Sequence, residues 1–186
     1  MSSATSNLLR PPEYCETARL ILRRPREEDA PAVFEAYASD PVATRYLAWI
    51  PYTKVETLAE FLRGRSEAWD KLDGHYAFLL CLRGADTPIG SIGIFIDAPK
   101  AMFGYVLGRA YWGHGYATEA LSALVAWTDT QPRIRRAWAY CAVDNVSSAR
   151  VMEKAGLERE GVLRRSQVFP NLGPEPRDCV YYAKVK

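Results

Sequence analysis

Two glycines, Gly113 and Gly115, lie between a segment typical of a strand and one typical of a helix. Residues 103–107 alternate and are rich in aromatic and β-branched side chains, as strands are. From Tyr116 to about Asp129, apolar residues recur at helical spacing. Glycine tolerates a positive φ and lets a ligand approach the backbone closely. At the start of a helix, such a turn directs free N–H groups and the positive end of the helix dipole to one point. This predicts an anion site, and phosphate is the usual anion.

A plain strand–turn–helix connection, in which the glycines serve only the turn, is the simpler alternative. The phosphate site is favoured because the glycines precede the helix instead of ending it. Two well-known nucleotide motifs are incomplete. Thr118 stands where a dinucleotide fingerprint has its third glycine, and the Gly-Lys-Ser/Thr of a P-loop is missing.

Length and composition are those of an ordinary globular domain. The chain has 186 residues, of which 48% are hydrophobic and 25% charged, so we expect one domain at 13–186 after a flexible tail at 1–12. A net charge of +2 argues against a nucleic-acid or membrane partner, and no apolar segment is long enough to span a bilayer. Four scattered cysteines predict reduced thiols in the cytoplasm, and two distant histidines give a metal site little support. We expect a monomer or a homodimer.

The sequence patterns predict about seven strands and four helices in the order β-α-α-β-β-β-α-β-α-β-β. Three central strands on short connections should form an antiparallel meander, and the strand that follows the helix 116–129 should lie parallel to the strand 103–107. The expected fold is α/β (α+β), with a mixed, mostly antiparallel twisted sheet and helices on both faces. The predicted helices are 25–40, 53–71, 116–129 and 144–154, and the predicted strands are 17–24, 76–82, 89–96, 103–107, 136–143, 163–169 and 177–186.

A second motif follows the glycine turn by about 30 residues, at Asn145–Leu157. Its first residue, Asn145, suits the N-cap of the helix that it opens. Gly156 suits the position just after the helix end, where glycine is common.

Together the two motifs resemble the GNAT family of N-acetyltransferases. Residues 112–120 are similar to the acyl-CoA pyrophosphate loop of the branch that acetylates ribosomal-protein N-termini (the RimJ/RimL type). Residues 145–157 resemble the family's Asn-x-x-Ser-x-Arg-x-x-Glu-Lys-x-Gly-Phe, with Leu157 in place of Phe. One departure is Ala110, which stands where the family loop opens with Gln or Arg; Arg109 lies one residue earlier. The resemblance runs from Thr17 to the C-terminus and implies the GNAT fold, splayed at its central parallel pair.

The resemblance implies acetyl-CoA as the acyl donor, a primary amine as the acceptor and no metal. In the family, backbone groups of the strand before the loop hold the thioester, the loop binds the pyrophosphate, and the Asn of the second motif binds the pantetheine arm. Arg150 is the motif residue suited to the 3′-phosphate of CoA. The implied cofactor-binding residues are Tyr105, Val106, Leu107, Trp112, Gly113, His114, Gly115, Tyr116, Ala117, Thr118, Asn145, Ser148 and Arg150.

Direct transfer needs a neutral amine. An α-amine, with a pKa of about 8, loses its proton more easily than a lysine, with a pKa of about 10.4, and therefore needs a weaker base. Candidate bases are Glu160, Asp144 and Glu119, and only Glu160 matches the base of a ribosomal-protein relative. Many members place a Tyr seven residues after the Asn to protonate the leaving thiolate. Met152 stands there, so Ser148 or water would do so. We therefore predict Glu160 and Ser148 as catalytic; the simpler alternatives are a solvated Glu and a first-turn Ser.

In the family, the region of Arg45, Tyr46 and Trp49 forms one wall of the acceptor cleft; a hydrophobic loop packed on the core is the alternative. The branch implies a protein N-terminus as acceptor, with a small amine or an antibiotic as the alternative. Two other classes stay open. A dinucleotide-binding oxidoreductase would use Asp144, at the end of the next strand, for a ribose. A non-catalytic CoA sensor is supported only by Met152.

Overall fold

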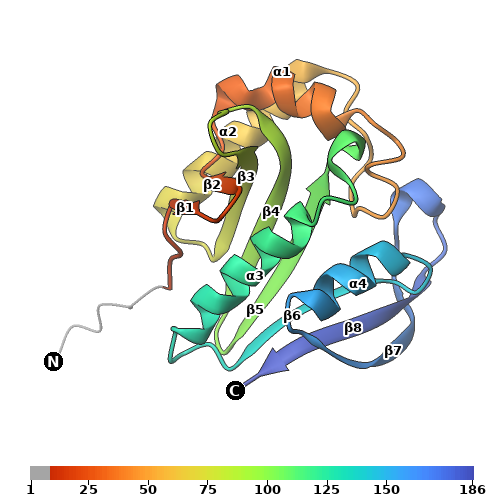
Figure 1. Cartoon of the computed structure of the whole chain (residues 1–186). Helices are drawn as coiled ribbons and strands as arrows, with labels where there is room; N and C mark the ends of the chain where they lie inside the picture. Colours follow the sequence, from red (N-terminus) through yellow and green to blue (C-terminus); the bar gives the residue numbers. More distant parts are fainter. Residues whose placement is uncertain (1–8) are drawn as a thin grey trace, which may run out of the picture.

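The computed structural model describes residues 9–186 (Figure 1). Of the predicted tail 1–12, residues 1–8 lie outside the described residues. Residues 9–12 have no regular structure, yet Pro11 is buried and the guanidinium of Arg10 lies 5.9 Å from the ring centroid of Trp69. The strands are β1 (Tyr14–Glu16), β2 (Leu20–Arg23), β3 (His75–Leu82), β4 (Pro88–Asp97), β5 (Lys100–Leu107), β6 (Arg136–Ala142), β7 (Glu158–Gln167) and β8 (Arg177–Val185).

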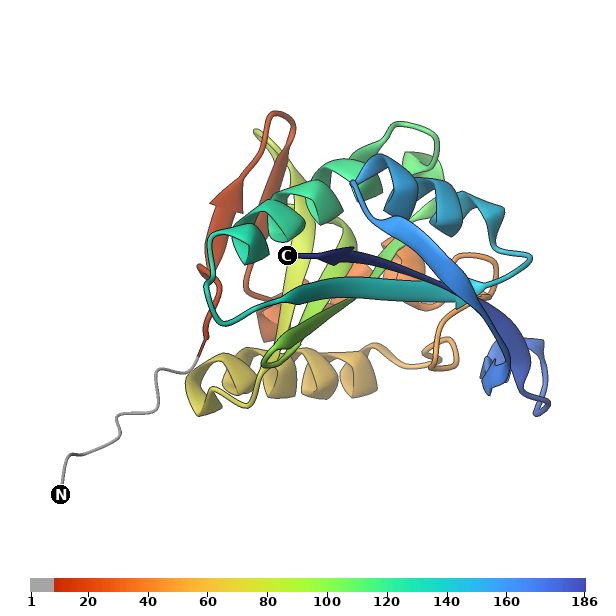
Figure 2. The same cartoon turned by 90° about the horizontal axis from the view of Figure 1, so that it is seen from below.

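The strands form one sheet in the order β1-β2-β3-β4-β5-β6-β8-β7, in which only β5 and β6 are parallel neighbours. Helices cover both faces of the sheet (Figure 2). This confirms the predicted fold class and excludes a doubly wound dinucleotide fold, whose sheet is mostly parallel. The helices are α1 (Ala30–Val33), α2 (Val55–Lys71), α3 (Tyr116–Asp129) and α4 (Val146–Lys154), with short helical turns η1 (Glu27–Asp29), η2 (Phe34–Ala38), η3 (Arg109–Tyr111) and η4 (Pro170–Leu172).

Two apolar cores hold the helices to the sheet. On one face, α3 and α4 pack on the sheet through residues such as Leu121, Leu124 and Met152. On the other face, α1, η2 and α2 pack through residues such as Val33 and Leu62. Along the buried side of these helices, apolar residues recur at i, i+3 and i+4. Burial of this apolar stripe explains why these segments are helical.

Three elements differ from the sequence prediction. β1 was missed, since a three-residue edge strand is too short for an alternation signal. The single helix expected at 25–40 is wound as η1, α1 and η2, with Pro31 in the first turn of α1. The last hairpin begins at Glu158 instead of Leu163, because β7 is a largely exposed edge strand whose polar residues hide its period.

The parallel pair is short, and this opens the sheet. β5 and β6 pair only over Lys100–Met102 and Arg136–Trp138. Beyond this pairing, β5 stays bonded to β4 and β6 stays bonded to β8, but the two facing edges no longer bond to each other. The result is a gap in the sheet at the carboxyl ends of the two parallel strands, where ligands of such sheets bind.

Candidate active site

The glycine turn has the geometry of an anion site. Gly113 and Gly115 have φ of +80° and +81°, in the left-handed region that favours glycine. Gly115 is the N-cap of α3 and no side chain caps the helix, so its first N–H groups lack a side-chain partner. The turn lies at the open end of the gap, and a Cβ at Gly113 would meet no atom within 4 Å.

Arg19, in the turn between β1 and β2, holds the glycine turn in place. Arg19 donates from Nη1 to the His114 carbonyl (2.9 Å) and from Nε to Glu119 (2.7 Å). Its guanidinium carbon lies 4.7 Å from the ring centroid of Tyr116, and that ring stacks on His114. Glu119 also accepts from the Thr17 hydroxyl at 2.6 Å. Partial burial opposes ionisation of Glu119, but these hydrogen bonds outweigh burial and lower its pKa. Glu119 therefore braces the turn as a carboxylate.

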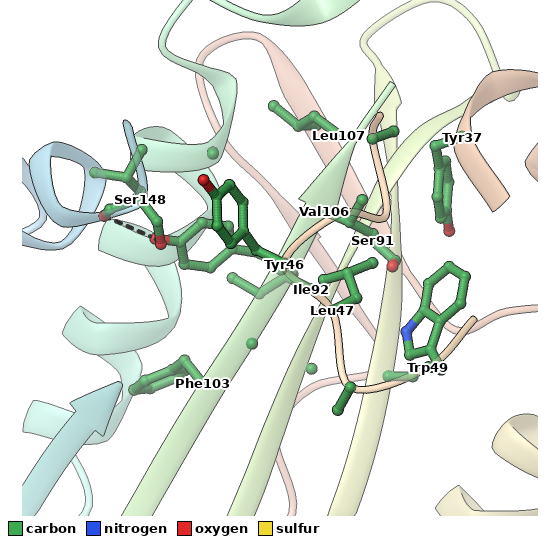
Figure 3. A pocket seen from close by; sticks show the side chains of 18 of the residues that line it. Tyr37, Tyr46, Leu47, Trp49, Ser91, Ile92, Phe103, Val106, Leu107 and Ser148 are labelled. Atoms are coloured by element: carbon green, nitrogen blue, oxygen red, sulfur yellow. Dashed lines mark hydrogen bonds between the residues drawn. The ribbon is translucent and has the colours of Figure 1, made fainter. Parts of the chain in front are cut away.

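The opposite side of the gap is formed by the start of α4. The side chain of Asn145 accepts a hydrogen bond from the Ser148 amide (3.2 Å), so Asn145 is the N-cap of α4. The Ser148 hydroxyl lies 2.8 Å from the hydroxyl of Tyr105 on β5 (Figure 3). Burial raises the pKa of Tyr105, an effect that the bond to Ser148 only partly offsets. Burial also raises the pKa of the nearby Cys141 thiol to about 11, so this cysteine is protonated at neutral pH.

Met152, which stands in place of the family's Tyr, and the predicted base Glu160 lie away from the gap. Met152 is fully buried in the core between α4 and the sheet. Glu160 lies on β7 and both of its carboxylate oxygens accept from the guanidinium of Arg136. This bond lowers the pKa of Glu160. Glu160 is not among the described residues that line the cavity beside the gap.

The segment 40–52, which follows η2, is held from two sides. Arg109 reaches Asp40 with its Nε 2.5 Å from Oδ2. From the C-terminal hairpin, the Asn171 amide donates to the carbonyl oxygens of Thr44 (2.7 Å) and Trp49 (2.9 Å). These bonds bring the segment 40–52 beside η4, although the two are more than 100 residues apart in the sequence.

A cavity of about 820 Å³ joins the gap to this segment. Figure 3 shows Ser148 on one side, Tyr46, Leu47 and Trp49 on the loop opposite, and Ser91, Ile92 and Val106 on the sheet between them. Its wall on the side of the glycine turn contains Trp112, whose indole N–H donates to the Leu107 carbonyl at 2.8 Å. All the predicted cofactor-binding residues line this cavity except His114, and Arg45, Tyr46 and Trp49 do so as well.

Sequence reasoning missed the face of the sheet on which the cavity rests. Ala77, Gly93 and Gly104 are neighbours in register on β3, β4 and β5, and all three line the cavity. A Cβ at Gly104 would meet no atom within 4 Å, so the sheet is open there. Tyr52, Phe61 and Arg65 line the same cavity. Small residues in adjacent strands were the available signal, but only the register shows that they are neighbours.

Residues 9–186 contain neither a cluster of metal ligands nor a helix suited to cross a membrane. In this part of the chain, no group of three or more His, Cys, Asp or Glu is placed to hold a metal ion. None of its helices combines the length and apolar character that a membrane crossing requires.

A mixed sheet that opens between two parallel strands, with a glycine turn at a helix N-terminus on one side of the opening, is the architecture that the resemblance to acetyl-CoA-dependent transferases implied. Residues 19–158 match the family model described as acetyltransferase (GNAT) domain. An uncharacterized N-acetyltransferase, p20 of Bacillus licheniformis, is 32% identical over 156 residues, which are 82% of this chain and 86% of that protein. The chain therefore belongs to the GNAT family and is an N-acetyltransferase that uses acetyl-CoA, as the sequence predicted.

Solved structures have the same fold. A GNAT-family acetyltransferase from Bacillus anthracis superposes with a TM-score of 0.80 at 28% identity, covering 92% of this chain and 98% of that one. RimL, described as a ribosomal L7/L12 α-N-protein acetyltransferase in complex with coenzyme A, superposes with a TM-score of 0.81 at 22% identity, covering 93% and 98%.

Proposed function

We propose that this N-acetyltransferase modifies the N-terminal α-amine of a protein. The observation that carries the proposal is the composition of the cavity lining: none of the described residues that line it is Asp or Glu, and the carboxylate of Asp144 interacts with the lining residue Tyr46. An amine acceptor must lose its proton before it attacks. At neutral pH an α-amine, with a pKa of about 8, has a far larger neutral fraction than a lysine side chain, with a pKa of about 10.4. The structural likeness to RimL, named for α-N-protein acetylation, supports the same acceptor.

The proposed reaction is a direct transfer. The amine nitrogen attacks the thioester carbonyl carbon, a C–N bond forms, and the C–S bond breaks. The proton of the amine passes to water, and the Ser148 hydroxyl donates a proton to the leaving thiolate and regains one from water. Tyr105, which bonds to Ser148, holds that hydroxyl at the gap. Backbone N–H groups in the segment Tyr105–Leu107 would stabilise the negative charge that develops on the carbonyl oxygen.

The proposal gives the remaining residues binding roles. The turn from Trp112 to Thr118 holds the pyrophosphate, Asn145 the pantetheine arm and Arg150 the 3′-phosphate. Arg45, Tyr46 and Trp49 contact the acceptor. The position of Glu160 outside the cavity favours a mechanism in which water, and not this carboxylate, takes the proton of the amine. A cytoplasmic location belongs to the same proposal and is supported by four cysteines that are all free thiols.

The test compares the acetylation of two peptides that share the same sequence context. The first has a free N-terminus and no lysine; the second has a blocked N-terminus and one lysine. Thiol release from acetyl-CoA gives the rate, and mass spectrometry locates the acetyl group. We expect kcat/KM to be about a hundredfold higher for the first peptide, as the difference in amine pKa requires. Equal use of the two peptides, or turnover of small amines only, would contradict the proposal.

A further inference from the structure

We infer that the acceptor carries a carboxylate or a phosphate on an apolar or aromatic body, and that Arg65 binds this negatively charged group. The inference rests on the proposed function, because it concerns the acceptor side of the same cavity.

Arg65 lies on the face of α2 that packs toward the sheet. Leu58 and Leu62 are 2% and 4% exposed, and Arg65 follows Leu62 by three residues and Leu58 by seven. This spacing keeps the three residues on one helix face. Ala68 and Trp69 continue the buried stripe. An arginine therefore occupies a position that the helix pattern reserves for an apolar side chain, and there it lines the cavity.

The guanidinium of Arg65 has an aromatic neighbour but no counter-ion. Its central carbon lies 5.0 Å from the ring centroid of Phe61. Among the described residues, no carboxylate forms an ion pair with it. Other basic residues of α2 do have partners: Arg63 pairs with Glu27 at 3.8 Å, and Lys71 with Glu67 at 3.0 Å. A charge-assisted hydrogen bond to an anion stabilises a half-buried cation more than a bond to a neutral acceptor does. A ligand that supplies such an anion would therefore bind to Arg65.

The space beside Arg65 fits a flat or apolar body. The rings of Trp49 and Tyr52 are 5.6 Å apart, and those of Tyr52 and Phe61 are 6.0 Å apart, so an aromatic row leads along the wall to Arg65. The floor below includes the small residues Ala77, Gly93 and Gly104, and a Cβ at Gly104 would meet no atom within 4 Å. Aromatic walls around an open floor favour an aromatic or aliphatic group that stacks on them.

The positive charge of the cavity lining also favours a negatively charged acceptor. Arg45 also lines the cavity on the acceptor side, and no described residue of the lining is acidic. Such a lining attracts an anionic acceptor. Cations near the reacting amine also disfavour its protonated form, which keeps more of it nucleophilic.

The experiment compares acceptors that differ only in charge. The small pair is alanyl-phenylalanine and its C-terminal amide; the peptide pair is a lysine-free octapeptide with Asp at its third and fourth positions and its Asn counterpart. Each is assayed for kcat and KM with acetyl-CoA, and for the Tm shift it causes in the presence of CoA. The enzymes are wild type, Arg65→Gln, Arg65→Lys and, as a matched control on the outer face of α2, Arg63→Gln.

We expect wild type and Arg63→Gln to favour the acidic member of at least one pair by about tenfold or more in kcat/KM, through KM. Arg65→Gln should bring that ratio close to one, and Arg65→Lys should retain part of it. The pair that shows the effect identifies the source of the anion, a small acid or an acidic peptide. An equal loss for both members in Arg65→Gln would overturn the inference, since it would mean that Arg65 only supports the fold.

The Tm shifts separate this inference from the proposed function. If acidic members raise the Tm through Arg65 but no amine is acetylated, the proposed reaction fails and the inference stands. The inference is overturned, whatever the turnover, if the charged and neutral members of each pair give equal kcat/KM values and equal Tm shifts. It is also overturned if no member binds.

Discussion

The hydroxyl of Tyr105 lies 2.8 Å from the hydroxyl of Ser148, and this contact connects β5 to α4 across the gap in the sheet. Burial raises the pKa of Tyr105, so its hydroxyl keeps its proton over the whole range in which an enzyme of this kind is assayed. Ser148 is thus held at the gap by a neutral partner, which supports its proposed role as the proton donor to the leaving thiolate.

Replacing Ser148 by Ala should lower kcat by about a hundredfold, the usual loss when a general acid is removed. Tyr105→Phe should lower kcat less, because it removes only the partner that positions the hydroxyl. Acetyl-CoA affinity, measured by calorimetry, should stay within a few-fold in both variants. Thr130→Ala, at the far end of α3, is the control. A wild-type kcat in Ser148→Ala would mean that water protonates the thiolate.

Gly115→Ala should weaken acetyl-CoA binding and lower stability by about 1 kcal/mol, since an L-residue at φ +81° is strained. The added Cβ would also lie 3.5 Å from Nη2 of Arg19. Gly84→Ala is a matched control: its φ is +86°, a Cβ there meets nothing within 4 Å, and it lies in a turn outside the cavity. Both variants should lose a similar amount of Tm, but only Gly115→Ala should raise the Kd for acetyl-CoA. Equal affinity in the two variants would argue against the turn as the phosphate site.

Local features were readable from the sequence, and distant contacts were not. Gly115 and Asn145 act within their own turns, so composition and position were enough to predict a helix start with an open N-terminus and an N-capped helix. Arg19 was missed because its partners lie 95 and 100 residues away. Arg65 was missed for another reason: the helix pattern was correct, but an arginine at i+3 from a buried leucine is noticed only when the cavity beside it is known.

The stability that Glu119 contributes should depend on pH. Its pKa lies below the ordinary value of 4.5 in the folded chain, so its bonds to Thr17 and Arg19 contribute fully above about pH 4.5. That contribution is lost as the pH falls through the folded-state pKa. Chemical unfolding of wild type and Glu119→Gln at several pH values should show a difference in free energy that is largest near neutral pH and shrinks in acid. A difference that does not change with pH would show that the charge of Glu119 is not what braces the turn.

Glu160→Gln decides whether this residue takes part in the reaction. Since Arg136 holds the carboxylate outside the cavity, we expect kcat/KM within about twofold of wild type and a small loss of Tm, as for other partly exposed ion pairs. Arg136→Gln should behave in the same way. A folded Glu160→Gln enzyme that loses activity by a hundredfold, with Arg136→Gln unaffected, would restore Glu160 as the base.

Asn171→Ala should raise the KM for the acceptor by about fivefold, because the segment 40–52 loses two hydrogen bonds from η4. Asn171→Asp should be worse, since a carboxylate would face the two carbonyl oxygens of Thr44 and Trp49. The Kd for acetyl-CoA should not change, as Asn171 is not among the described residues that line the cavity. If donor binding weakens as much as acceptor binding, Asn171 supports the whole fold and not the acceptor wall.

The short pairing of β5 with β6 has a consequence for how the enzyme responds to its donor. Beyond Met102 and Trp138, each strand has an edge whose amide and carbonyl groups find no partner in the neighbouring strand. Backbone groups that water can reach exchange their hydrogens, while paired and buried ones are protected. The middle of the sheet, ordinarily the slowest region to exchange, is therefore expected to exchange quickly along this seam in the free protein. A donor lying in the gap would slow exchange on both strands at once, so amide hydrogen exchange can map its position in the unaltered enzyme.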